Sequence, residues 1–148
     1  MKLNKIVKLA SILSRFVEKS TTQKKHVAAI IENGKIQYIR SNAPGVHAEY
    51  SSYLSYISYQ LKCKNCKYKP YKNIKISKTL LVIRYENGLF KNSKPCKECI
   101  EKLRCNVKKI IYSTGDQTNP FICEKLSELE NSWQSNLVKK VKDRVYSK

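Results

Sequence analysis

The amino-acid sequence predicts an α/β fold, in which helices pack in layers against a sheet. An apolar stripe at helical spacing indicates a first helix over residues 3–18. Asn33-Gly34 then separates two strand-like runs, which is the strongest short-range signal of a β-hairpin. Two further strand-like runs, residues 79–85 and 107–112, flank a helical segment that follows Pro95. Strands and helices therefore alternate along the chain, as in a layered domain.

The remaining elements follow from local patterns in the same way. Beyond the first helix, we expect hairpin strands over 26–31 and 35–40, a helix over 47–61, a Lys-rich insertion over 62–78, a short helix over 97–104 and a mainly helical region over 121–146 that includes a basic C-terminal helix over 131–148. At this length the chain is expected to form a single domain, residues 1–148. A hydrophobic content of 41% is enough to build a core and argues against wholesale disorder.

The charge of the chain is strongly positive. Thirty Lys or Arg residues face 11 Asp or Glu, which gives a net charge of +19. Such a field attracts phosphate groups, although codon bias toward lysine produces the same composition without a polyanionic partner. Four tyrosines at helical spacing, Tyr50, Tyr53, Tyr56 and Tyr59, fit either a platform for stacking bases or an apolar core stripe.

The six cysteines are expected to be reduced. Lys8 interrupts the apolar stretch near the N-terminus, so no secretory signal is predicted and the compartment is expected to be intracellular and reducing, cytoplasmic or nuclear. A mitochondrial presequence is the alternative reading of the same segment. No apolar run approaches the ~20 residues of a membrane span, so no membrane partner is expected.

Two short segments carry the chemistry. His47-Ala48-Glu49 and Pro95-Cys96-Lys97-Glu98-Cys99 each stand at the predicted start of a helix. One imidazole and two thiolates supply three protein ligands for Zn²⁺ and leave the fourth tetrahedral position for water. Glu49 lies two residues beyond the histidine, close enough to exchange protons with that water without binding the metal.

The H-x-E and P-C-x-x-C segments, with a strand between them, are a known signature of zinc-dependent nucleobase deaminases. On these residues the chain resembles the cytidine and deoxycytidylate deaminase superfamily over roughly residues 3–130. The resemblance implies a cytidine-deaminase-like three-layer sandwich, with a mixed sheet of about five strands flanked by helices. It also implies that His47, Cys96 and Cys99 bind zinc and that Glu49 is the proton shuttle.

The resemblance further implies hydrolytic deamination, in which zinc-bound hydroxide attacks C4 of cytosine or C6 of adenine and ammonia leaves. A cytosine nucleoside or nucleotide, as in cytidine or deoxycytidylate deaminases, is the expected substrate. A single-stranded DNA or RNA deaminase acting on cytosine or adenine is the alternative. Most relatives oligomerise, so a homo-oligomer is expected by resemblance.

Three residues are candidates for substrate binding. Asn42 falls where relatives place an Asn that touches the sugar or base, although it equally suits a turn before Ala43-Pro44-Gly45. The backbone of Ala48 holds the base in relatives. Tyr112 precedes the loop with which relatives select their substrate.

A second Cys-x-x-Cys, Cys63 and Cys66, lies in the Lys-rich insertion. It suits a second, structural zinc shared with Cys105, Cys123 or His26, or a pair of reduced thiols on a loop. A rival of another class joins Cys63 and Cys66 to Cys96 and Cys99 in one closed site of a non-catalytic, nucleic-acid-binding zinc ribbon. That reading leaves His47 and Glu49 without a role.

Overall fold

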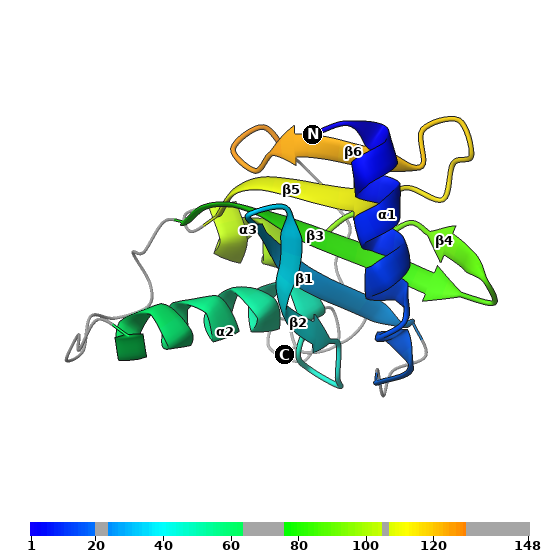
Figure 1. The fold of residues 1–148 in the computed structure, drawn as a ribbon. Coiled ribbons are helices and arrows are strands. Elements are labelled where there is room, and N and C mark those ends of the chain that lie inside the picture. Colours follow the sequence, from blue (N-terminus) through cyan, green and yellow to red (C-terminus); the bar gives the residue numbers. More distant parts are fainter. Residues whose placement is uncertain (20–23, 64–75, 105–106, 130–148) are drawn as a thin grey trace, which may run out of the picture.

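The computed structural model describes residues 1–19, 24–63, 76–104 and 107–129, which form a mixed sheet with three α-helices (Figure 1). The sheet has six strands in the order β2-β1-β3-β5-β6, with β4 paired to β3 outside this path. The elements are α1 (Leu3–Ser14), a 3-10 turn (Val17–Lys19), β1 (His26–Glu32), β2 (Lys35–Ser41), α2 (Ala48–Cys63), β3 (Ile76–Glu86), β4 (Leu89–Lys91), α3 (Lys97–Arg104), β5 (Val107–Ser113) and β6 (Phe121–Lys125).

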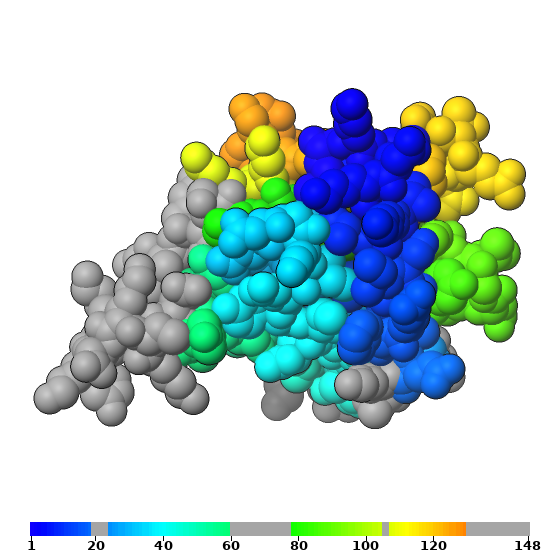
Figure 2. Space-filling model, in the orientation of Figure 1, coloured from blue at the N-terminus to red at the C-terminus, as the bar shows by residue number. Residues whose placement is uncertain are grey.

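The helices cover both faces of the sheet and create two cores. Side chains of a strand alternate between faces, and β1 and β3 divide accordingly. Ala28, Ile30, Leu80 and Val82 face α2 and α3, whereas their neighbours Val27, Ala29, Leu81 and Ile83 face α1. Figure 2 shows α1 in blue, lying across one face of the molecule beside the β1–β2 hairpin. The predicted α/β class is confirmed, and the layers are consistent with a cytidine-deaminase-like sandwich.

The predicted hairpin is confirmed. Asn33 and Gly34 have φ angles of 51° and 75°, and two positive φ values at the central positions are what a type I′ turn requires. The first helix ends at Ser14, four residues earlier than expected, and the 3-10 turn follows it. The helix predicted over 47–61 and the strand predicted over 79–85 are both present and somewhat longer, as α2 and β3.

The expectation of a mainly helical region over 121–146 is wrong at its start, because Phe121–Lys125 is strand β6. It pairs antiparallel with β5 and places Ile111 opposite Cys123. The pairing supplies the backbone hydrogen bonds that β5 would otherwise lack on that side. Phe121 also packs edge-on against Phe90 of β4, with ring centroids 5.3 Å apart. The C-terminal helix expected over 131–148 lies outside the described residues, as do residues 64–75 of the Lys-rich insertion.

The connection from β3 to β5 sets the position of the segment Pro95–Cys99 on one face of the sheet. These two strands are parallel, so the chain must cross over between them, and α3 is part of that crossover. The segment Pro95-Cys96 therefore enters α3 at the end of the sheet where β3 stops.

Within the described residues, no helix is long and apolar enough to span a bilayer.

Truncating the centre of the sheet should destabilise the fold. Leu80 is fully buried in β3, so Leu80→Ala is expected to lower the free energy of unfolding by about 2–5 kcal/mol through lost burial and a residual cavity. Leu89→Ala removes the same atoms from a side chain that is 56% exposed and should cost no more than about 0.5 kcal/mol. Urea denaturation of both variants measures the difference, and equal losses would contradict this core assignment.

Candidate metal centre

Two helix starts meet at the candidate site. His47 immediately precedes α2, and its carbonyl accepts the first helical hydrogen bond from the Ser51 amide at 3.1 Å. Cys96 stands in the same position before α3, where its carbonyl accepts from the Ile100 amide at 3.0 Å. Both residues are thus the N-caps of their helices. The positive ends of two helix dipoles consequently point at the same place, which favours negatively charged ligands there.

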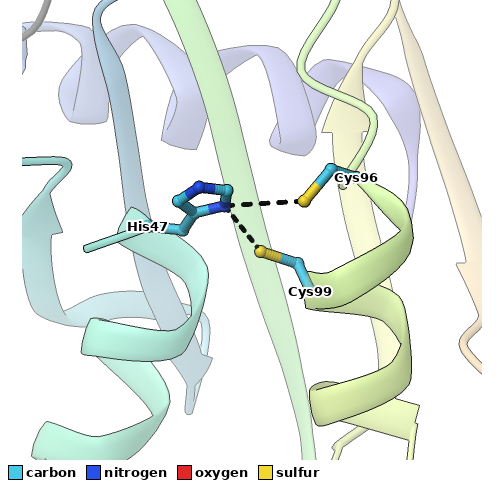
Figure 3. A group of neighbouring side chains, drawn as sticks. All are labelled: His47, Cys96 and Cys99. Atoms are coloured by element: carbon cyan, nitrogen blue, oxygen red, sulfur yellow. Dashed lines mark hydrogen bonds between the residues drawn. The ribbon is translucent and has the colours of Figure 1, made fainter. Parts of the chain in front are cut away.

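The three predicted ligands lie together, as Figure 3 shows. His47 Nδ1 is 2.8 Å from the Cys99 sulfur and 3.6 Å from the Cys96 sulfur. All three ligand atoms fall within 4.8 Å of one another. Both cysteines are buried at 3% exposure, whereas His47 is half-buried. This cluster therefore has the size and the access of a metal site that opens toward solvent on the histidine side.

The ionisable groups of the cluster influence one another strongly. A hydrogen bond from the Cys99 thiol and a second with His47 together lower the pKa of Cys96 to about 4, against the opposing effect of burial. The shared proton and burial raise the pKa of Cys99 far above its ordinary value. The hydrogen bond with Cys96 raises the pKa of His47 against the effect of burial. Without a metal the cluster thus favours one thiolate, that of Cys96, beside a protonated imidazole.

The donor set fits Zn²⁺. Two thiolates and one imidazole are typical protein ligands of this ion, and tetrahedral coordination would place the imidazole nitrogen about 3.5 Å from each sulfur. The Cys96 distance already matches that value, and the Cys99 distance requires a small opening of the cluster. Among the residues that the structure describes, no fourth His, Cys, Asp or Glu joins the group. A metal held by these three side chains would keep one coordination position for water or substrate.

Glu49 lies beside the cluster without belonging to it. It sits in the first turn of α2 and is only 5% exposed. Its negative charge raises the pKa of both His47 and Cys99, which places the carboxylate within electrostatic reach of these two ligands. A buried carboxylate next to an open metal position is able to accept and return protons there. The predicted arrangement of three ligands and one neighbouring acid is therefore present in the geometry.

A pair of serines fixes the segment that carries Cys96, and no local sequence pattern indicates this contact. The buried Ser93 hydroxyl donates to the Val82 carbonyl at 2.9 Å and accepts from the Ser113 amide at 2.9 Å. The Ser93 amide donates in turn to the Ser113 carbonyl at 2.8 Å. The loop before α3 is thereby tied to the middle of β3 and to the end of β5, which limits how far Cys96 can move.

The three substrate-binding candidates have different surroundings. Asn42 ties the end of β2 to the start of β1: its Oδ1 accepts from the His26 amide at 3.1 Å and its Nδ2 donates to the Lys24 carbonyl at 2.7 Å. Ala48 is fully buried at the start of α2. Tyr112 is 3% exposed and its hydroxyl donates to Glu124 of β6 at 3.0 Å. Their contact with a substrate stays a prediction.

The helix α2 separates the two Cys-x-x-Cys segments. Cys63 is the last residue of α2, so its backbone lies about 22 Å along the helix from the start at Ala48. Cys96 and Cys99 contact His47 at that start. A closed site that holds Cys63 together with Cys96 and Cys99, as the zinc-ribbon reading requires, is incompatible with this separation.

A second zinc at Cys63 and Cys66 stays a prediction, because Cys66, Cys105 and the side chain of Cys63 lie outside the described residues. Of the further ligands considered for it, Cys123 is exposed on β6 and His26 begins β1. Strands β3 and β5 stand between those two, about 14 Å in all. His26 and Cys123 therefore cannot share one metal ion.

No protein-family model, curated protein or solved structure matches this chain. The resemblance to cytidine deaminases therefore rests on the two short motifs, the order of the elements and the geometry of the cluster.

Metal analysis tests the assignment of the ligands. In a background with Cys63→Ser and Cys66→Ser, the protein is expected to retain one zinc per chain after dialysis. Adding Cys99→Ser should abolish this binding, because two remaining ligands hold the ion too weakly. Adding Cys123→Ser, which removes an exposed thiol outside the cluster, should leave it unchanged. Retention of stoichiometric zinc in the Cys99 variant would contradict the site.

The metal-free protein should carry one thiolate in the cluster at mildly acidic pH. Between about pH 7 and pH 5, an ordinary thiol with a pKa near 8.5 is protonated, whereas Cys96 with a pKa of about 4 is not. Thiolate absorbance in the ultraviolet, compared with the double variant Cys96→Ser, Cys99→Ser, is expected to report one thiolate throughout this range. A difference of zero, or of two, would disagree with the shared proton.

Proposed function

We propose that the protein is a zinc-dependent hydrolytic deaminase that acts on the cytosine of a nucleoside or nucleotide. The observation that carries the proposal is the three-ligand cluster of His47, Cys96 and Cys99 with the buried Glu49 beside it. A structural zinc site normally has four protein ligands, whereas a catalytic one keeps a position open. A neighbouring acid that is not a ligand can exchange protons with water at such an open position.

Each residue of the cluster has a defined part in this reaction. His47, Cys96 and Cys99 would hold a zinc ion, which would lower the pKa of a water molecule toward about 7 and so supply a nucleophile at neutral pH. The helix starts at His47 and Cys96 stabilise the two thiolates and fix the ligands relative to each other. Glu49 would take one proton from the attacking water and deliver it to the ring nitrogen of the base. It would then transfer the proton of the new C4 hydroxyl to the amino group, which departs as ammonia while the C4 carbonyl forms.

Cytosine is preferred over adenine in this proposal because the resemblance is to cytidine and deoxycytidylate deaminases. The half-buried position of His47 leaves the cluster accessible from one side, as a base entering from solvent requires. A polynucleotide deaminase catalyses the same reaction, but its cytosine or adenine belongs to a DNA or RNA strand and not to a free nucleoside or nucleotide. The surfaces around the cluster, not the ligands, decide between these two substrates.

Replacing the proposed proton shuttle separates chemistry from metal binding. Glu49→Gln preserves the shape of the side chain, so the variant should fold and retain zinc. It is expected to lose about 10²–10⁴-fold in deamination, because the amide cannot accept the proton. Glu101→Gln in α3, an exposed carboxylate outside the site, is the matched control and should retain full activity.

The activity is measured by incubating the zinc-loaded protein with cytosine- and adenine-containing nucleosides, nucleotides and oligonucleotides and weighing the products for exchange of the amine for a carbonyl. Substantial deamination by the Glu49 variant would remove Glu49 from the mechanism. Zinc-loaded protein without activity on any member of the panel would overturn the proposed function.

A further inference from the structure

A groove of about 540 Å³ lies between helix α2 and β2, the strand at the edge of the sheet. We call it the tyrosine groove, because Tyr38 of β2 and Tyr50 and Tyr59 of α2 contribute their rings to its wall. Arg40 of β2 and Leu54 of α2 also line it. Among the described residues that line it there is no carboxylate to repel an anion. Tyr59 is 55% exposed, which leaves much of its ring in contact with solvent.

The backbone of Tyr38 is held in a conformation that bulky residues rarely adopt. Its φ angle is 55°, and it lies in a β-bulge where Tyr38 and Ile39 oppose the single residue Ala29. The Ser52 hydroxyl of α2 donates to the Tyr38 carbonyl at 2.7 Å and so fixes this conformation. Backbone strain of this kind persists where the surroundings enforce it, and it is concentrated at binding sites.

The strained residue places its ring within an aromatic cluster at the groove. The Tyr38 ring packs edge-on against Tyr56, with centroids 5.3 Å apart, and is tilted against Tyr59 at 5.9 Å. Three rings from two elements therefore support one another. Such a rigid aromatic wall presents π faces at low cost in conformational entropy.

The groove adjoins the metal centre through α2 and α3. Tyr50 follows Glu49 directly in the chain, and Val46, which also lines the groove, precedes the ligand His47. The Lys102 ammonium of α3 lies 5.3 Å from the centroid of the Tyr50 ring. The charge of Lys102 also acts on His47, where it opposes the rise in pKa that the hydrogen bond with Cys96 causes. One cation thus stands near both the groove and the ligands.

We propose that the tyrosine groove binds the nucleotides of a single-stranded nucleic acid that flank the base presented to the metal centre. This inference rests on the proposed deaminase function and makes a strand, rather than a free nucleotide, the preferred substrate. Aromatic faces stack on any base, and an arginine pairs with the phosphates between them. The net charge of +19 supports the same partner.

Binding of a cytosine-free strand tests the groove separately from catalysis. The zinc-loaded full-length protein is titrated into a fluorescent oligothymidylate at several salt concentrations, and anisotropy is recorded. Tyr59→Ala is expected to weaken binding about 5- to 100-fold through lost stacking, whereas Tyr59→Phe keeps the ring and should bind like the wild type. Because Tyr59 is largely exposed, its truncation leaves the core intact.

Arg40 is tested by the salt dependence of the same titration. Arg40→Ala should reduce the slope of log affinity against log salt by about 0.7, the value for one lost phosphate contact on a single strand. Lys35→Ala removes one exposed charge from the same strand outside the groove and is expected to leave the slope unchanged.

Equal affinity of Tyr59→Ala and wild type for the strand would overturn the groove proposal. Equal effects of Arg40→Ala and Lys35→Ala on the salt slope would also overturn it, because they would indicate attraction by net charge alone. A peptide or a second copy of the chain in the groove would also give these results.

Deamination of free deoxycytidine monophosphate and of cytosine within an oligonucleotide is measured in parallel. Equal turnover of the two would defeat the preference for a strand while leaving the deaminase function intact. If the strand binds in a way that depends on Tyr59 and Arg40 but no deamination is detected, the deaminase function is rejected and strand binding in the groove is retained.

Discussion

The meeting of two helix N-termini is the constraint on which the site depends. The hairpin β1–β2 leads into α2, and the parallel pair β3 and β5 requires a crossover that contains α3. Both helices pack on the same face of the sheet, so their N-cap residues, His47 and Cys96, come together. The metal ligands are therefore positioned by the topology of the whole sheet and not by a local loop. A change that moved either helix start would separate the imidazole from the sulfurs.

Burial makes this cluster unfavourable unless its charges are balanced. Two cysteines at 3% exposure and a carboxylate at 5% share one small region. In the absence of a metal, a proton shared between the sulfurs reduces the charge, and the raised pKa of His47 favours a positive imidazole beside them. A divalent cation would replace these protons and neutralise the two thiolates. The positive helix ends add to the same effect. The composition of the cluster and its electrostatics are thus both compatible with a bound cation beside an acid.

Local patterns were sufficient to predict the class of the fold, the hairpin and the three ligands. Asn33-Gly34 determines its turn through its own backbone preferences, and the ligands occur in two short motifs at helix starts. Features that depend on long-range partners could not be predicted. Phe121–Lys125 has no clear strand pattern of its own, and strand β6 is stabilised by its antiparallel pairing with β5. The serine tie at Ser93 and the bulge at Tyr38 likewise depend on residues distant in the sequence.

The coordination of bound zinc, observed by X-ray absorption, is the most direct test of the central claim. The protein with Cys63→Ser and Cys66→Ser, loaded with one zinc per chain, is the sample. The account predicts two sulfur ligands at about 2.3 Å and two nitrogen or oxygen ligands at about 2.0–2.1 Å, one of them the His47 imidazole and one a solvent oxygen. A first shell of four protein ligands, with three or four sulfurs, would contradict an open catalytic position.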